Sequence, residues 1–590
     1  MGTISDKLMR IINTKEDIRQ ALISKGYDVP TSIPFKEYAK MILDLPCKVD
    51  SFPDIEGIVA RYSASGLTNE QMAANPVWVD KTSNGHDLQL KNLAWGGMSG
   101  VGGYADNWNS SADWAINSYW VNSYTDHKLQ FIKASSVVQA RSNNIYNAEN
   151  VYKNILNVNG LTEAVNKGSV KALRIIATDP ITSKAIKTLS FDSDGVIQIS
   201  FDDVLQDCYV AYFLSGNNTN DIDITIEQLP LYPGALVFDG VDDYGVCDNF
   251  PILTKEKGYT VVVLRQWDQD FLNTTLTGGL LSTRNYSTGE GVAFEKIESS
   301  NKGYWNLGAG GIIDFAKSPF TWQTSKQYNN VGILKGDKNH GKPLCVRCGL
   351  SGGQQCGRFA IWELVFLDHD ATEEELTKIK DYFVKTYPWL FPNQAWTVTG
   401  KTNEDEDRAT IANITGNGNN LVLSNFGFAE GSGYNEEGEY AGYLVTDGVD
   451  DKIISSIFKM GNDWTVIGDW ELINTGKNDN AGIVKFDSIV IYNYNYNSML
   501  INIKNGRNIL IPDQNTVNAI CSDGRIYSKD WKESIYNEET ESTSKNFLTI
   551  GYSGNAYTKI AFKNLAIYPT VLSREDCIKA YNYLQTLKAK

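Results

Sequence analysis

The sequence lacks an excess of positive charge and lacks any long apolar run. It has 54 Lys and Arg against 70 Asp and Glu, which gives a formal net charge of −16 at pH 7. Phosphate groups are bound mainly by basic side chains, so this balance argues against nucleic acid or anionic lipid as the main partner. No window approaches the roughly 18 consecutive apolar residues of a membrane-spanning helix, and we expect no membrane insertion. The first residues, Met-Gly-Thr-Ile-Ser-Asp, also lack the pattern of a signal peptide.

Histidine and cysteine are scarce as well. The four histidines lie outside any nucleophile-elbow or zinc-protease motif. The eight cysteines are scattered without a framework, which predicts free thiols in a chain made in a reducing cytoplasm. His340, Cys345, Cys348 and Cys356 have residue types that suit Zn²⁺, but cysteines in strands are more often buried core residues. Both interpretations remain open, and no cofactor is expected.

A duplication is the strongest positive feature of the sequence. Leu-Val-Phe-Asp-Gly-Val-Asp-Asp-Tyr at 236–244 returns as Leu-Val-Thr-Asp-Gly-Val-Asp-Asp-Lys at 444–452. Two further pairs of segments match in the same order, at 87–93 with 420–426 and at 360–366 with 561–567. Three ordered landmarks predict a duplicated domain.

The repeated unit has the pattern of a β fold with one closing helix. Short alternating apolar runs predict strands at 259–264, 329–334, 464–467 and 560–562. The Asp-Gly pairs at 239–240 and 447–448 are expected to form tight hairpin turns. Thr372 and Ser573, each with an acid three positions on, are expected to cap the closing helices. The fold class is therefore mainly β, with two tandem jelly-roll sandwiches.

Three motifs occur in each copy: the strand and turn at 236–244, the late strand at 360–366 and the capped closing helix that follows. Together they resemble the concanavalin A-like, laminin-G-like jelly roll. The resemblance covers 75–104 with 231–388, and again 395–590. It implies two stacked antiparallel sheets and binding of glycans or proteins through loops or a concave face. It does not imply catalysis.

Residues 1–46 have the pattern of a short helical anchor. Apolar residues recur at helical spacing at Ile4, Leu8, Ile11, Ile18 and Leu22. This segment resembles N-terminal anchoring segments of virion proteins in tailed phages, especially crAss-like phages that infect Bacteroides-type hosts. The resemblance implies a homotrimeric fibre or appendage bound to other virion proteins through 1–46, made in the host bacterial cytoplasm and located in the virion. A helical cap on a cytoplasmic protein is the alternative.

The resulting domain map has five parts. They are a helical anchor at 1–46, a linker with the first strands of jelly roll 1 at 47–104, an inserted β-rich domain at 105–230, the rest of jelly roll 1 at 231–388, and jelly roll 2 at 389–590. Within the insert we expect a helix somewhere in 145–175 and strands at 196–201, 208–213 and 222–226.

Acidic residues raise the questions of metal binding and catalysis. Asp239, Asp242 and Asp243, and likewise 447, 450 and 451, have oxygen ligands spaced for Ca²⁺, but a tight turn needs the same residues for its backbone. The densest acidic run, 404–407, has no apolar neighbours and is expected to be a solvated loop. Hydrolases on this kind of sandwich carry carboxylates that alternate along one strand. No such strand is evident, so we expect no enzyme activity.

Aromatic residues provide the candidate binding sites. Trp108, Trp114 and Trp120 lie among Asn, Ser and Asp, and 492–496 alternates tyrosine with asparagine so that Tyr492, Tyr494 and Tyr496 share one face of a strand. Aromatic rings stack on the C–H faces of sugars while amides and carboxylates bind hydroxyls, so both groups are candidate glycan sites. The alternative is that they are core residues.

Together these features predict a structural phage fibre that displays glycan-binding jelly rolls for attachment to the host surface. A polysaccharide depolymerase on the same architecture and a bacterial surface adhesin are the rival interpretations.

Overall fold

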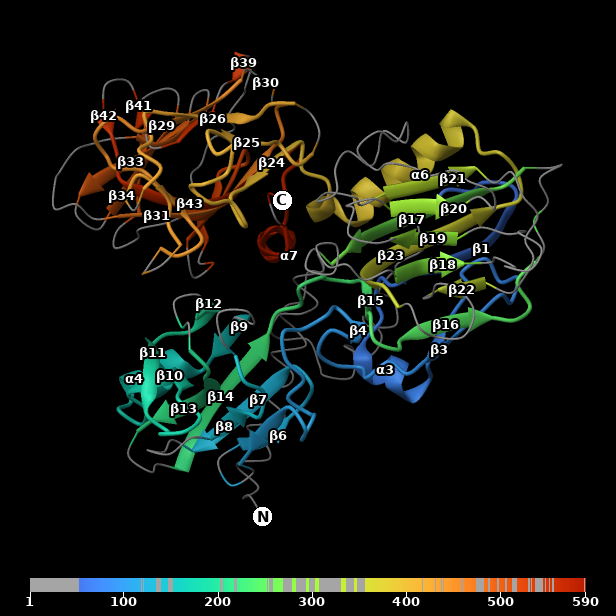
Figure 1. Cartoon of the computed structure of the whole chain (residues 1–590), viewed down its shortest axis with the longest axis horizontal. Helices are drawn as coiled ribbons and strands as arrows, with labels where there is room; N and C mark the ends of the chain where they lie inside the picture. Colours follow the sequence, from blue (N-terminus) through green and yellow to red (C-terminus); the bar gives the residue numbers. More distant parts are fainter. Residues whose placement is uncertain are drawn as a thin grey trace, which may run out of the picture. The chain divides into compact units, whose positions relative to one another are not determined.

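The computed structural model describes residues 52–590 with gaps, of which the longest are 269–277, 283–292, 307–330, 336–343, 347–355, 474–481 and 536–544. The predicted anchor at 1–46 lies outside the described residues. Within the described part, strands far outnumber helices and form several antiparallel sheets, which confirms the mainly β fold class (Figure 1). No described helix is both long enough and apolar enough to cross a membrane.

The first jelly roll consists of two sheets around one core. One sheet has the strand order β21-β17-β23-β15-β4, with β1 also paired to β23, and the other has the order β2-β3-β16-β22-β18-β19-β20. Alternate residues of the strands point into the core, where Tyr62, Trp78, Phe238, Trp267 and Phe359 are almost completely buried. The strands are β1 Ile58–Ser63, β2 Val77–Trp78, β3 Leu88–Lys91, β4 Gly100–Val101, β15 Leu236–Asp239, β16 Tyr244–Cys247, β17 Thr260–Trp267, β18 Gly278–Ser282, β19 Ala293–Lys296, β20 Gly303–Asn306, β21 Val331–Lys335, β22 Leu344–Val346 and β23 Arg358–Leu367.

The second jelly roll repeats this plan. Its sheets have the orders β27-β28-β43-β31-β36-β37-β38, with β24 also paired to β43, and β25-β26-β29-β40-β32-β33-β34-β35. The strands are β24 Gln394–Thr397, β25 Thr410–Ile411, β26 Leu421–Ser424, β27 Gly433–Tyr434, β28 Leu444–Val445, β29 Lys452–Ser455, β31 Thr465–Leu472, β32 Gly482–Phe486, β33 Ile489–Asn495, β34 Ser498–Ile503, β35 Arg507–Ile511, β36 Val517–Cys521, β37 Arg525–Ser528, β38 Glu533–Ile535, β40 Leu548–Ile550 and β43 Ile560–Tyr568.

Matching pairings in the two jelly rolls bear out the duplication. In the first copy β23 pairs with β15, β17 and β1, and in the second copy β43 pairs with β28, β31 and β24 in the same way. Each copy also carries the expected capped helix. Thr372 forms a capping box with Glu375 at the start of α6 (Glu373–Thr386), and the Ser573 side chain accepts a hydrogen bond from the Asp576 amide at the start of α7 (Arg574–Gln585).

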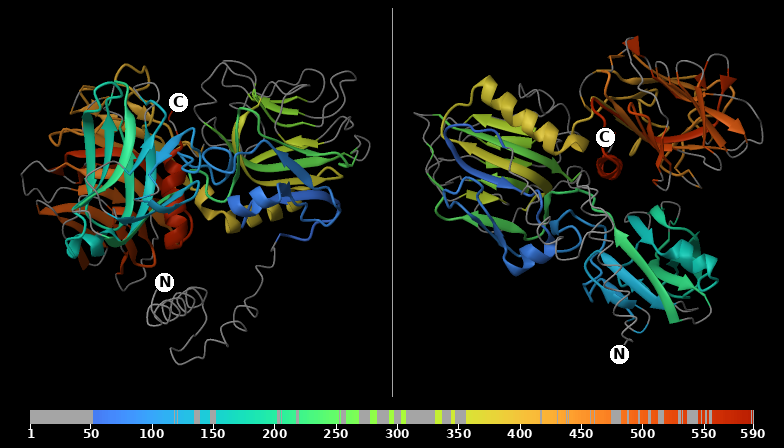
Figure 2. Two further views of the ribbon diagram at one scale, coloured as in Figure 1. Left: turned by 90° about the horizontal axis from the view of Figure 1, so that it is seen from below. Right: turned by 180° about the vertical axis from the view of Figure 1, so that it is seen from behind.

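The inserted segment forms a sandwich of its own. Two five-stranded sheets, β11-β10-β13-β8-β5 and β12-β9-β14-β7-β6, stack face to face with an apolar core between them (blue through cyan to green in Figures 1 and 2). The elements are β5 Trp114–Ile116, β6 Val121–Tyr124, β7 Lys128–Lys133, β8 Ala140–Ser142, β9 Lys153–Asn159, α4 Leu161–Asn166, β10 Ala172–Thr178, β11 Ala185–Phe191, β12 Gly195–Ser200, β13 Tyr209–Ser215 and β14 Asn220–Gln228. The three strands expected here are present. The expected helix is limited to α4, because β9 and β10 occupy most of the remaining window.

Candidate functional site

The repeated Asp-Gly-Val-Asp-Asp segment forms the same turn in both jelly rolls. In the first copy the turn follows β15 and leads into β16, which belongs to the opposite sheet. The hairpin prediction is therefore wrong, because the turn carries the chain from one sheet to the other. Gly240 has a φ of +78°, and a Cβ there would lie 3.1 Å from the Arg358 backbone nitrogen, so this position requires glycine.

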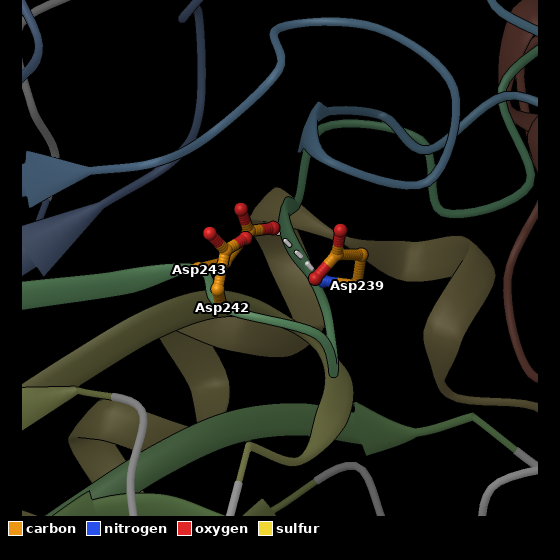
Figure 3. A group of neighbouring side chains, drawn as sticks. All are labelled: Asp239, Asp242 and Asp243. Carbon is orange, nitrogen blue, oxygen red and sulfur yellow. Dashed lines mark hydrogen bonds between the residues drawn. The ribbon is translucent and has the colours of Figure 1, made fainter. Parts of the chain in front are cut away.

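Two of the three acids in the first turn hold its backbone (Figure 3). The Asp239 carboxylate accepts a hydrogen bond from the Val241 amide at 2.7 Å, and the Asp243 carboxylate accepts one from the Asp239 amide at 2.9 Å. The Ser99 hydroxyl donates to the second Asp243 oxygen at 3.0 Å. Asp243 is buried, and this burial raises its pKa to about 7 in spite of the two hydrogen bonds.

An asparagine from a neighbouring loop completes the support. The Asn92 side-chain amide donates to the Asp242 carbonyl at 3.1 Å, and Asn92 itself has a φ of +66°. Asparagine tolerates this left-handed conformation better than most residues do. The Leu-x-Leu-x-Asn pattern at 88–92, which returns at 421–425, thus has a local role, since it ends strand β3 with the residue that holds the turn.

The second copy reproduces the hydrogen bonds to backbone groups, but no partner for the second Asp451 oxygen is found among the described residues. The Asp447 carboxylate accepts from the Val449 amide at 2.8 Å, the Asp451 carboxylate accepts from the Asp447 amide at 2.8 Å, and the Asn425 amide donates to the Asp450 carbonyl at 3.0 Å. Asp451 is buried, and burial raises its pKa to about 6. Two turns at separate sites therefore share one hydrogen-bonding plan.

The hydrogen bonds explain some, but not all, of the residues that are identical in the two turns. Backbone geometry accounts for the first aspartate, the glycine and the last aspartate of each turn. The valine and the middle aspartate have exposed side chains, and Val241 and Val449 are 72% and 71% exposed. An exposed valine gains nothing from burial, so its presence in both copies has no explanation in the packing.

The same residues contain the clusters of oxygen atoms that could hold a metal ion. One carboxylate oxygen from each of Asp239, Asp242 and Asp243 lies within 4.8 Å of the others, and 447, 450 and 451 form an equivalent group. Oxygen ligands of this kind suit Ca²⁺. The backbone hydrogen bonds of the first and third acids account for their positions without an ion.

The prediction of a zinc cluster falls largely outside the described residues. His340 and Cys348 are not described, and of Cys345 only its place in strand β22 is known. Cys356 is buried. Cys208, Cys247 and Cys577 are buried free thiols, and Cys521 is also buried.

The tryptophan platform is wrong for the two tryptophans that the structure describes. Trp108 and Trp114 are 1% and 2% exposed and pack edge to face within the core of the inserted domain. One of the polar residues near them, Asp106, is itself buried and accepts hydrogen bonds from Trp114 and from the Tyr152 hydroxyl. Trp120 lies outside the described residues.

The tyrosine candidates remain a prediction. Tyr492 and Tyr494 lie in strand β33, so the expected strand is present, and Tyr496 lies outside the described residues. The acidic run at 404–407 is a turn-rich loop in which Asp407 pairs with Lys401 at 2.8 Å, in keeping with the expected solvated loop.

Sequence reasoning missed one pair of carboxylates. Asp469 and Glu471 alternate with the core residue Trp470 along β31, so both project away from the core on one face of the strand. Asp469 is 7% exposed and accepts a hydrogen bond from the Tyr443 hydroxyl at 3.1 Å. The Asp-Trp-Glu segment shows this alternation in the sequence, but it is too short to stand out.

Comparisons with known proteins give only distant likenesses. No family model matches the chain, and no curated protein matches it. A botulinum neurotoxin type G receptor binding domain aligns at 11% identity over 32% of this chain and 50% of that one, with a TM-score of 0.22, so the chain spans half of its length. A botulinum neurotoxin serotype D binding domain aligns at 13% identity over 59% of this chain and 89% of that one, with a TM-score of 0.24. A Trypanosoma rangeli sialidase in complex with sialic acid aligns at 7% identity over 79% and 83% of the two chains, with a TM-score of 0.26. At these TM-scores the site is interpreted from its own geometry.

Proposed function

We propose that this chain is a structural appendage protein of a tailed phage that binds glycans on the bacterial surface through its β-sandwich domains. Residues 1–46 would fasten it to other virion proteins, as their resemblance to phage anchoring segments suggests. The proposed assembly is a homotrimer that is made in the host cytoplasm and located in the virion. Successive sandwich domains along one chain suit such a role, because each adds surface for contact without requiring catalysis.

The observation that carries the binding part of this proposal is the pair of exposed side chains that the two turns share. Val241 and Asp242, like Val449 and Asp450, have side chains without a part in the hydrogen bonds that hold the turn. Their surroundings differ between copies, since Phe238 and Tyr244 correspond to threonine and lysine. A contact made outside the chain explains why these two positions stayed the same.

The chemistry of the turn suits a saccharide. An exposed carboxylate accepts hydrogen bonds from sugar hydroxyls, and a valine methyl group packs against the C–H face of the ring. One such turn offers little surface and is expected to bind weakly. Several turns on one particle together strengthen binding. Once one turn has bound, the others meet the same glycan surface at a high effective concentration.

Binding of labelled full-length protein to surface polysaccharide from Bacteroides-type cells tests this part of the proposal. The four-residue variant Val241→Ser, Asp242→Ala, Val449→Ser, Asp450→Ala should bind at least about tenfold more weakly, which corresponds to about 1.4 kcal/mol. Val79→Ser is the matched control, because Val79 is also exposed, at 48%, but lies outside both turns. Equal binding by the four-residue variant and the control would contradict the assignment of the turns.

Attachment to the particle needs a separate experiment. Antibody against the chain should label an appendage of the virion in electron micrographs, and deletion of 1–46 should abolish incorporation. Light scattering of the full chain should give about three times the 65.6 kDa protomer mass. A 65.6 kDa species at micromolar concentration would contradict the trimer.

A polysaccharide depolymerase is the second candidate, and Asp469 and Glu471 are the observation that favours it. Two carboxylates on one face of a strand are the arrangement used for acid–base cleavage of glycosidic bonds. The burial of Asp469 and its hydrogen bond from Tyr443 fit a structural role better. Release of reducing ends from surface polysaccharide by the purified protein, and its loss in Glu471→Gln, would establish the depolymerase instead.

A further inference from the structure

One outer face of the inserted domain combines arginine and aromatic side chains. On β10 and β13 the residues Leu173, Ile175, Val210 and Tyr212 point into the core and are fully buried. Side chains alternate along a strand, so their neighbours on these strands point to the outer face of the sheet. The residues on that face are Arg174, Ile176, Thr178, Tyr209, Ala211 and Phe213, joined by Arg141 from β8.

The two arginines of this face are held by aromatic rings. Arg174 lies directly opposite Phe213 in the strand register, and its guanidinium carbon is 5.9 Å from the centre of that ring. Arg141 reaches across to Tyr209, with its guanidinium carbon 5.1 Å from the ring centre. Cation–π contacts of this kind restrain a guanidinium group and reduce the freedom that it loses on binding.

Among the residues that the structure describes, neither arginine is paired with a carboxylate. Both side chains are exposed. The strand register places threonine, serine and alanine beside them, at Thr188, Ser190 and Ala115. Although the chain has a net charge of −16, this face carries local positive charge and can bind a negatively charged group.

We propose that this face binds an acidic glycan, with Arg141 and Arg174 each engaging a carboxylate of a sugar acid. A planar guanidinium donates two parallel hydrogen bonds to a carboxylate, which a single ammonium group does not. Tyr209 and Ile176 supply apolar surface for the C–H face of the sugar ring. The two arginine-bearing strands flank β13, so their backbones are about 10 Å apart, a spacing that suits an extended chain carrying successive charges.

A saccharide fits this face better than a nucleic acid does. Tight nucleic-acid binding neutralises many phosphates, whereas this face offers two arginines on a strongly acidic chain. The inference rests on the proposed glycan-binding function and names the class of ligand for one domain. It assigns binding to a different domain from the two turns.

Binding of oligogalacturonate and of oligoalginate to the full chain tests the inference, with the carboxyl-reduced forms of both and a single-stranded oligonucleotide as comparison ligands. The uronate chains should bind, and the double variant Arg141→Gln, Arg174→Gln should lose at least about tenfold in affinity. Lys128→Gln removes one positive charge from the outer face of the other sheet and should bind like the unmodified protein. Arg141→Lys with Arg174→Lys keeps the charge but not the paired hydrogen bonds, and should also weaken binding.

Three results would overturn the inference. They are no binding of either uronate, equal binding of the carboxyl-reduced forms, and equal binding by the double glutamine variant. Preference for the oligonucleotide would identify a nucleic-acid face instead. Thermal melting of each variant confirms that the domain remains folded. If cells are bound but the double variant is unaffected, this inference fails alone, whereas the absence of any binding to bacterial glycans defeats the proposed function.

Discussion

Replacing Asp243 with asparagine should remove a pH dependence that the first turn builds into the fold. Burial raises the pKa of Asp243 to about 7, from an ordinary value of 3.8. The folded state therefore holds this proton over a pH range in which the unfolded state has released it. The stability that this carboxyl contributes is fully present below about pH 4 and is lost as the pH rises to about 7.

The size of the effect follows from the shift. About three pKa units correspond to at most about 4 kcal/mol, since each unit is worth about 1.4 kcal/mol. Asp243→Asn keeps the shape of the side chain and an oxygen that can accept the Asp239 amide, but it does not titrate. The quantity to compare is the free energy of local unfolding of the unmodified protein minus that of the variant. This difference should fall by up to about 4 kcal/mol between pH 4 and 7.

Hydrogen exchange of the β15 and β16 amides, corrected for intrinsic rates, measures this difference locally. A local measurement is needed because unfolding of a chain with several domains is not two-state. The amides of β28 and β29 in the second jelly roll serve as an internal control: their protection can vary with pH because of Asp451, but the difference between the two proteins should stay constant. A difference between the two proteins at β15 and β16 that stays constant from pH 4 to 8 would refute the reasoning.

Three further predictions concern the fold. Trp108→Ala should destabilise the inserted domain by about 3–5 kcal/mol through loss of core packing, and a native melting profile would contradict the core assignment. Asn92→Ala should cost about 1–2 kcal/mol in hydrogen-exchange stability of the first turn, because alanine is strained at a φ of +66°, while Asn92→Gly should cost less; the reverse order would contradict the backbone argument. Glu363→Gln should destabilise the first jelly roll by about 3–5 kcal/mol, since it leaves Arg61, 4% exposed and paired at 3.2 Å, without its counter-charge; Arg61→Met with Glu363→Leu should recover much of this loss in thermal melting, and no recovery would contradict the pairing.

The sequence predicted the features that depend on local pattern. Alternating apolar residues located strands such as β17 and β31, and Thr372 and Ser573 mark the starts of both closing helices. The repeated motifs predicted a duplicated domain, and the two jelly rolls pair their strands alike. Features that depend on register between distant segments could not be predicted in this way.

The inserted domain shows why. Trp108 and Trp114 have polar neighbours in sequence, yet one of these neighbours, Asp106, is buried and accepts hydrogen bonds from Trp114, Tyr152 and Asn154. Their burial therefore depends on residues as distant as Asn154. The arginine face is equally hidden, because Arg141 and Arg174 meet Tyr209 and Phe213 only once β8, β10 and β13 have paired.

The most direct test of glycan binding is a comparison of four proteins on an array of surface polysaccharides from Bacteroides-type bacteria. These are the unmodified chain, the four-residue turn variant, the double arginine-to-glutamine variant and a variant with all six changes. The account predicts that the turn variant binds more weakly to both neutral and acidic glycans, that the arginine variant loses acidic glycans only, and that the six-residue variant retains neither. Binding by the six-residue variant that equals that of the unmodified chain, or no binding by the unmodified chain, would contradict it.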